Sequence, residues 1–494
     1  MSITYDIPPQ STSNLWGNAS KYVTISHVYG ITIFTIAALF ELTPLLKKHE
    51  IYPIFCIIFL LTSIFVYFLF GFPHILGING GKLIGIGNGT KYLRIGSVGL
   101  GIVATTFWSL ELALAICDGG YTVAYCILVG LVIILHFLQM HFNFICSNIL
   151  LKLPQWLIRF GVMHTFASNL WICFIYFVNE SARAKRNEPT NKTRAASFHD
   201  EPLHYYQPVI IKKLGNSDTA DKILVLNVMF FIIGSVISLT IWKQIGKREI
   251  DTDEVRIYSR LSVGKPMIGA SIGVFLFVIA SALEFLSTFI NSDFIIFIHH
   301  LIFYNISAIT LSILIVKLYP DIRGCTPTHS NNFLNNVLLL LTTFGSIVYS
   351  LTGLFGSMDD TQIHGAIFLT SFIIKLIMII LQSVVIFTLL KYGPSLNGNN
   401  PSGQQLVSLL VALNFIMFLT PLFAHSPYSY GFSSQLAPTH NILNIISTPL
   451  IVLYRFQCCM LFIEIYKVIY YLNVSYKFVN WARLAIEVPQ KSQF

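Results

Sequence analysis

The hydrophobic positions of this chain form long blocks, without the two-residue or 3.6-residue alternation of half-buried strands and helices. A helix needs about 20 consecutive apolar residues to cross a hydrocarbon core about 30 Å thick. The blocks therefore predict an all-α polytopic membrane protein. The twelve expected transmembrane helices cover residues 22–46, 51–72, 94–117, 121–147, 157–179, 223–245, 267–290, 294–318, 332–355, 365–391, 404–424 and 443–470.

Composition excludes several other classes of protein. Hydrophobic residues make up 54% of the 494 residues and charged residues only 11%, too few for the surface of a water-soluble chain. The net charge of +9 comes from basic residues between the spans and not from a basic stripe, so we expect no nucleic-acid partner. The eight cysteines show no CxxC spacing and no hydrolase motif is present. We expect no enzyme activity, no cofactor and no resident metal.

Lys and Arg predict the orientation of the spans. If the N-terminus is inside, 19 of the Lys and Arg residues lie in the termini, in the even-numbered loops and at the span ends beside them. The short odd-numbered loops carry only Lys47 and Lys48. The long loop 180–222 is basic but holds the glycosylation sequon of Asn191, with that of Asn179 at its edge. We therefore expect a multi-pass plasma-membrane protein with both termini cytosolic and this loop outside.

The apolar blocks also repeat within the chain. Residues 36–41 (IAALFE) match residues 279–284 (IASALE), so that Glu41 lies over Glu284 at an offset of 243. Three further matches have nearly the same offset: Ser109 with Ser350, Gln139 with Gln382, and Asn169 with Asn414. Four matches at a nearly constant offset indicate a duplication.

Six spans return the chain to its starting side, so the two halves are predicted to be parallel six-helix repeats, or half-barrels. The expected organisation is a cytosolic tail at 1–22, a first half at 22–246, a cytosolic linker at 247–266, a second half at 267–470 and a cytosolic tail at 471–494.

Charged residues inside the spans are the first candidates for a transport path, because an ionised group at the membrane centre costs at least about 3 kcal/mol unless it faces protein or water. The acids are Glu41, Glu111 and Glu284, all in the outer third of their helices. They are either proton sites or the partners of the embedded cations Lys375 and Arg455. Glu464 lies near a helix end and is assigned to charge pairing.

Uncharged polar residues form a second candidate set. Their side chains either order a chain of water along which protons hop, or hydrogen-bond neighbouring helices together. These residues are Gln139, His164, Asn169, Gln382, Asn414 and Gln457. The histidines in outer loops add the expectation that extracellular Zn²⁺ modulates the protein, although no pair of them has the spacing of metal ligands.

Three segments resemble the otopetrins, a family of proton-selective channels. They are FLQMHFNF at 137–144, RFGVMHTFASNLWICF at 159–174 and STPLIVLYRFQCCMLFIEIYK at 447–467. The resemblance implies two six-helix barrels per subunit, a homodimer, and a proton current into the cell that external acid drives.

Two positions depart from the pattern of that family. Gln457 stands where the family commonly has His, and Met229 where its sixth span often has an acid. Both belong to the contact between the halves, so the half-barrel interiors become alternative routes. The first half holds two of the three acids, because Glu111 lies over Thr352, and we expect it to conduct better. A proton-coupled secondary transporter and a non-conducting or regulated otopetrin paralogue remain alternatives.

Overall fold

The computed structural model consists of helices throughout the part of the chain that it describes. That part covers residues 12–43, 51–75, 91–119, 121–144, 154–186, 218–245, 268–290, 293–325, 333–358, 363–393, 403–423 and 438–471. The helices are α1 (Thr12–Leu42), α3 (Ile51–Ile75), α4 (Lys91–Asp118), α5 (Val123–Phe144), α6 (Gln155–Arg186), α9 (Asp218–Gln244), α10 (Ile268–Ile290), α11 (Asp293–Arg323), α12 (Phe333–Met358), α13 (Ile363–Tyr392), α14 (Gln404–Phe423) and α15 (Pro438–Tyr466), the last continuing into a short π-helix, Lys467–Tyr471.

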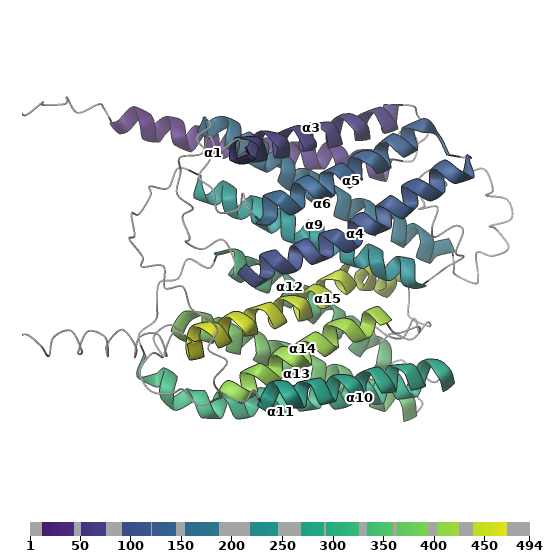
Figure 1. Ribbon diagram of the computed structural model, residues 1–494, viewed down its shortest axis with the longest axis vertical. Helices are drawn as coiled ribbons and strands as arrows, with labels where there is room; N and C mark the ends of the chain where they lie inside the picture. The colour runs from purple at the N-terminus through teal and green to yellow at the C-terminus, as the bar shows by residue number, and fades with distance from the viewer. Residues whose placement is uncertain are drawn as a thin grey trace, which may run out of the picture.

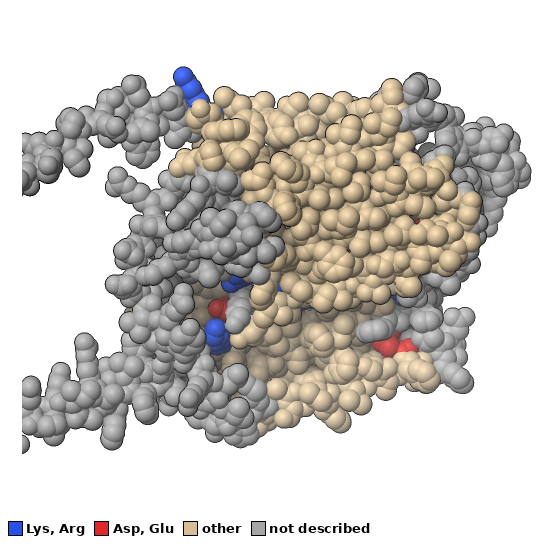
Figure 2. All heavy atoms as spheres, turned by 45° about the horizontal axis from the view of Figure 1, so that its top comes forward, with Lys and Arg blue, Asp and Glu red and all other residues tan. Residues whose placement is uncertain are grey.

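The predicted fold class is confirmed. Among the described residues, eleven helices are long and apolar enough to cross a membrane, and α14 has a shorter apolar segment, Gln404–Thr420. Each helix falls on one predicted span, and α4 and α5 are separate helices despite the short connection between them. Most of the described surface in Figure 2 is free of Lys, Arg, Asp and Glu, as a surface that faces lipid requires.

The helices lie side by side in one elongated array (Figure 1). Helices α1 and α3 lie at one end, α10 and α11 lie at the other, and α9, α12 and α15 lie between them. The burial of side chains agrees with the place of each helix in the array. Helix α9 buries Met229, Phe230 and Phe231 completely, whereas α10 exposes Val274 and Phe275. Helix α9 is therefore enclosed by protein on all sides, and α10 presents an apolar face outward.

The two groups of six helices share one packing pattern. Helix α6 packs on α1 and α9, just as α14 packs on α10 and α15. The pairs α4–α5, α3–α5 and α4–α9 likewise correspond to α12–α13, α11–α13 and α12–α15. Contacts between the groups run through α4, α6 and α9 on one side and α12, α14 and α15 on the other. The pattern places the interior of each group between its own helices. The duplication itself stays a prediction.

Candidate functional site

The three membrane acids are buried, and two of them accept hydrogen bonds from tyrosines. Glu41 on α1 accepts a hydrogen bond from the hydroxyl of Tyr52, at the start of α3. Glu111 on α4 accepts one from the hydroxyl of Tyr125, at the start of α5, with an O···O distance of 2.5 Å. Glu111 has no exposed surface. The first half thus holds two acid–phenol pairs, each joining the end of one helix to the start of the next.

The two tyrosines line one cavity of about 160 Å³, which is bounded by α3, α4, α5, α6 and α9. Its wall is mostly apolar and aromatic and includes Trp108 and Trp171. Asn179 and Glu180, near the end of α6, add polar groups on the predicted outer side. This volume has room for several water molecules. Both acid–phenol pairs therefore adjoin a space that water or hydronium can occupy.

A histidine that the sequence analysis did not select lies next to this cavity. His136 on α5 is completely buried, and its Nε2 atom lies 2.7 Å from Oδ1 of Asn227, which lines the cavity. Its Nδ1 atom lies 2.7 Å from the carbonyl oxygen of Val132. A carbonyl oxygen only accepts, so Nδ1 carries a hydrogen.

His136 can exist in two protonation states at this position. The neutral ring accepts a hydrogen bond at Nε2 from the Asn227 amide, whereas the imidazolium donates from Nε2 to the amide oxygen. Rotation of the Asn227 side-chain amide turns either its oxygen or its NH₂ group toward Nε2, so Asn227 can bond to either protonation state of His136. His136 was missed because a lone histidine in an apolar run is usually a satisfied core residue. Its partner lies 91 residues away, and no local spacing indicates the pair.

Two predicted residues, Gln139 and Asn169, meet on the far side of His136 from the cavity. Both amides lie beside Gly234 on α9: a Cβ atom added there would lie 1.9 Å from Nε2 of Gln139 and 2.9 Å from Nδ2 of Asn169. Asn169 also donates a hydrogen bond of 3.4 Å to the hydroxyl of Tyr67. The Gln139 amide makes no hydrogen bond within the described part of the chain, so its donors and acceptor are available to water.

The first half therefore contains a series of polar groups, which we name the first-half column. From the predicted outer side it runs through the acid–phenol pairs and the cavity to His136 and Asn227, and then to Gln139 and Asn169. Its members are Glu41, Tyr52, Glu111, Tyr125, His136, Asn227, Gln139, Asn169 and Tyr67.

His164, another predicted residue, lies beside this column. Its Nδ1 atom lies 3.1 Å from the hydroxyl of Tyr29 on α1, and its Nε2 atom lies 3.5 Å from the carbonyl oxygen of Phe59 on α3. The ring also packs edge-on against Phe59. His164 therefore joins α6 to α1 and α3, and none of these contacts is with a member of the column.

The corresponding amides of the second half bond to each other. Gln382 donates from Nε2 to Oδ1 of Asn414 at 2.8 Å, and Asn414 donates to the carbonyl oxygen of Leu410. The two predicted residues are thus adjacent, as Gln139 and Asn169 are. They differ in that they satisfy each other directly, which leaves fewer groups for water.

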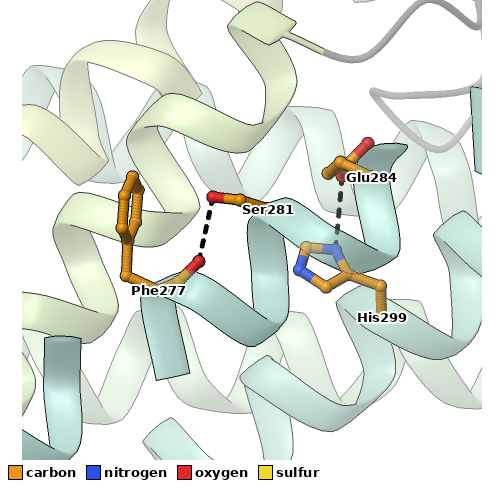
Figure 3. A network of polar contacts seen from close by, with 4 residues as sticks. All are labelled: Phe277, Ser281, Glu284 and His299. Carbon is orange, nitrogen blue, oxygen red and sulfur yellow. Dashed lines mark hydrogen bonds and ion pairs between the residues drawn. The ribbon is translucent and has the colours of Figure 1, made fainter. Parts of the chain in front are cut away.

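The third acid has a histidine as its partner. Nδ1 of His299 on α11 lies 3.4 Å from Oε1 of Glu284 on α10, and both side chains are buried (Figure 3). The neighbouring Ser281 donates to the carbonyl oxygen of Phe277, on its own helix. At the offset of 243, Tyr52 corresponds to residue 295, so His299 comes one helical turn later. The second half pairs its outer acid with an imidazole, whereas the first half uses a phenol.

The two embedded cations contact aromatic rings. Nζ of Lys375 on α13 lies 5.0 Å from the ring centre of Tyr304 and 4.9 Å from that of Tyr349. Cζ of Arg455 on α15 lies 5.0 Å from the same Tyr304 ring. Glu464 interacts electrostatically with Lys467 and Arg94, near one end of α15 and α4.

Gln457 and Met229, the two departures from the family pattern, are both completely buried. Gln457 accepts a hydrogen bond of 3.0 Å from Thr342 and donates one of 3.2 Å to the carbonyl oxygen of Asn335, both on α12. Met229 belongs to the hydrophobic core. Gln457 therefore bonds within its own half, while Met229 supplies only apolar contact.

Some predicted features lie outside the described residues. They are Asn191 and its sequon, the linker 247–266, residues 1–11 and 472–494 of the terminal segments, and the outer-loop histidines His49, His199, His204 and His425. Asn179 is described only as part of the cavity lining, and its glycosylation stays a prediction.

Apolar helices around buried acids, amides and a histidine define the chain as a polytopic membrane protein with a polar interior. A sequence profile described as Otopetrin matches residues 92–210 and 207–456. The chain therefore belongs to the otopetrin family, a family of proton-channel-type membrane proteins and not of enzymes. A search of curated proteins found no match.

The close approach at Gly234 gives a test of the first-half column. In Gly234→Ala the new Cβ would overlap the Gln139 side chain, so we expect the amide to move and the proton current to fall about threefold or more. Gly130→Ala on α5 is the matched control, because a Cβ there meets nothing within 4 Å. Whole-cell currents, normalised to surface expression, measure both. Equal currents in the two variants would show that Gln139 does not contribute to the conducting path.

Proposed function

We propose that this otopetrin is a proton-selective channel of the plasma membrane, which carries H⁺ into the cell when the outside becomes acidic. The observation that carries the proposal is the first-half column, with its two acid–phenol pairs beside one cavity and its buried His136–Asn227 pair. We further propose that protons cross through this half and not through the contact between the halves.

The groups of the column suit proton hopping. The carboxyl, imidazole and hydroxyl groups of such a path each take up one hydrogen and release another, and amides orient the waters between them. Glu41 and Glu111 attract protons to the outer part of the path. His136 then offers a titratable group next to the cavity, where its two hydrogen-bonding arrangements correspond to the two protonation states.

The second half is less suited to carry a cation. Lys375 and Arg455 are both buried in its interior. At a separation of 5 Å and an effective dielectric constant of 20, each charge repels a proton by about 3 kcal/mol. Val132 occupies the first-half position that corresponds to Lys375 at the offset of 243. The same level of the first half therefore lacks this source of repulsion.

The contact between the halves is also a weak candidate for the route. Met229 cannot titrate, and the amide of Gln457 is bonded to α12. The loss of two titratable groups at this contact argues for a path elsewhere. The homodimer, the cytosolic termini and an effect of extracellular Zn²⁺ stay predictions.

Electrical recording tests the proposed channel directly. We expect external acidification to evoke an inward current whose reversal potential follows the proton equilibrium potential when internal and external pH are varied. Surface labelling of the same cells shows that the protein has reached the membrane. Labelled cells without such a current would contradict the channel, and a flux that saturates with an organic solute would favour the secondary transporter.

A further inference from the structure

The second half contains two buried cations for which the described residues provide no carboxylate contact. Lys375 is 7% exposed and Arg455 only 1%. The three described rings around Nζ of Lys375 belong to Tyr304, Tyr349 and Phe372, at 5.0, 4.9 and 5.3 Å. Arg455 packs on Tyr304 and Tyr454. Both cations thus meet at Tyr304, in an aromatic environment.

The hydrogen bonding of Arg455 leaves one edge of its guanidinium group unused. Its Nη1 atom lies 3.5 Å from the sulfur of Met378. Nε and Nη2 are buried and have no hydrogen-bond partner among the described residues. These two nitrogens share the side of the guanidinium that binds anions through two parallel N–H donors. The group left unsatisfied is therefore a two-pronged donor for an anion.

The two neighbouring positive charges favour a negative charge near Lys375 and Arg455. Lys375 and Arg455 interact with each other as like charges, and the hydroxyl group of Tyr304 lies within hydrogen-bonding reach of both. A buried ion without a partner costs several kcal/mol, and two like charges increase that cost. Aromatic faces return only about 2 kcal/mol for each desolvated cation. The described side chains thus provide a hydroxyl group but no carboxylate to compensate the two charges.

We propose that the second half binds one small monovalent inorganic anion, with chloride as the abundant representative, between the free edge of Arg455 and the ammonium group of Lys375. The site shares no residue with the first-half column, so its test does not require a proton current.

A stability measurement on the purified full-length protein tests this site without any need for proton current. The apparent melting temperature is measured while chloride replaces gluconate at constant ionic strength. A ligand that binds only the folded state raises this temperature in a saturable way, and we expect a rise of about 2 °C or more. Bromide should substitute for chloride.

Two lysine variants on the same helix decide whether the effect belongs to this site. In Lys375→Met we expect the chloride-dependent rise to disappear. Lys391→Met is the control, because Lys391 also lies on α13 but is exposed near its end, and it should keep the rise. Loss of the rise in both variants, or its retention in Lys375→Met, would contradict the assignment.

A second measurement covers the case in which Lys375→Met fails to fold. Line broadening of the ³⁵Cl resonance by the wild-type protein should saturate with chloride and be displaced by bromide. If the wild-type protein shows neither saturable broadening nor a chloride-dependent melting temperature, then no anion is bound and the charges are compensated within the protein.

Discussion

Replacing His136 by phenylalanine is expected to reduce the acid-evoked proton current about tenfold or more, while the protein still reaches the cell surface. The imidazole is the titratable group that adjoins the inner part of the cavity, and a positioned acid–base group accelerates proton transfer by large factors. Phenylalanine has nearly the same shape, and the present ring already stacks on Phe230 at 5.3 Å and packs edge-on against Phe231 at 4.9 Å. The fold should therefore survive the change.

His164→Phe is the matched control for this variant. His164 is another buried histidine of the first half, with a phenylalanine ring packed against it, but it bonds to Tyr29 on α1. We expect this variant to keep at least about half of the wild-type current, since a hydrogen bond between helices contributes only about 0.6 kcal/mol on average. A His136→Phe protein that conducts like the wild type would show that protons bypass His136.

The second large effect is expected for Glu111→Gln. Glutamine keeps the shape of the side chain and still accepts the hydrogen bond from Tyr125, but it cannot take up a proton. We expect the current at a given acidic pH to fall about fivefold or more. Glu41→Gln changes the other acid–phenol pair of the same cavity, and we expect a fall in the same direction.

Glu284→Gln provides the comparison between the halves. Glu284 is buried like Glu111 but pairs with His299 in the half that contains Lys375 and Arg455. We expect it to change the current by less than about twofold. The comparison uses the currents of all three variants. These currents are normalised to surface protein and measured over a series of external pH values. A fall in Glu284→Gln as large as that in Glu111→Gln would contradict conduction through the first half.

The two halves satisfy equivalent positions in different ways. Gln139 and Gln382 correspond in sequence, yet Gln382 bonds directly to Asn414 while the Gln139 amide is available to water. Glu41 and Glu284 also correspond, but one accepts from a phenol and the other faces an imidazole. At the position of the buried cation Lys375 in the second half, the first half has Val132.

Much of the fold could be predicted from the sequence because lipid permits few solutions. Backbone groups in a hydrocarbon core must be bonded within the segment, so each long apolar block had to be a helix. The two runs around residues 118–120 became separate helices, as predicted. The rarity of polar residues inside the spans also made Glu111, Gln139 and Asn169 visible as candidates.

The sequence could not identify which polar groups meet. Glu111 pairs with Tyr125, and a tyrosine among apolar residues carries no signal that it donates to an acid. His136 and Asn227 lie on α5 and α9, far apart in the chain. One of the two alternatives for the membrane acids paired them with Lys375 and Arg455, whereas in the structure these cations contact Tyr304 and its neighbouring rings.

The sequence alone therefore determined that the chain is a bundle of membrane helices with a few buried polar groups, because hydrophobic length and the cost of buried charge act locally. Only the tertiary structure decided how those groups are distributed: a cavity with two acid–phenol pairs beside His136 in one half, and two cations on aromatic rings in the other. The physical reason is that hydrogen bonds and ion pairs depend on the rotation and packing of whole helices, which no short segment specifies.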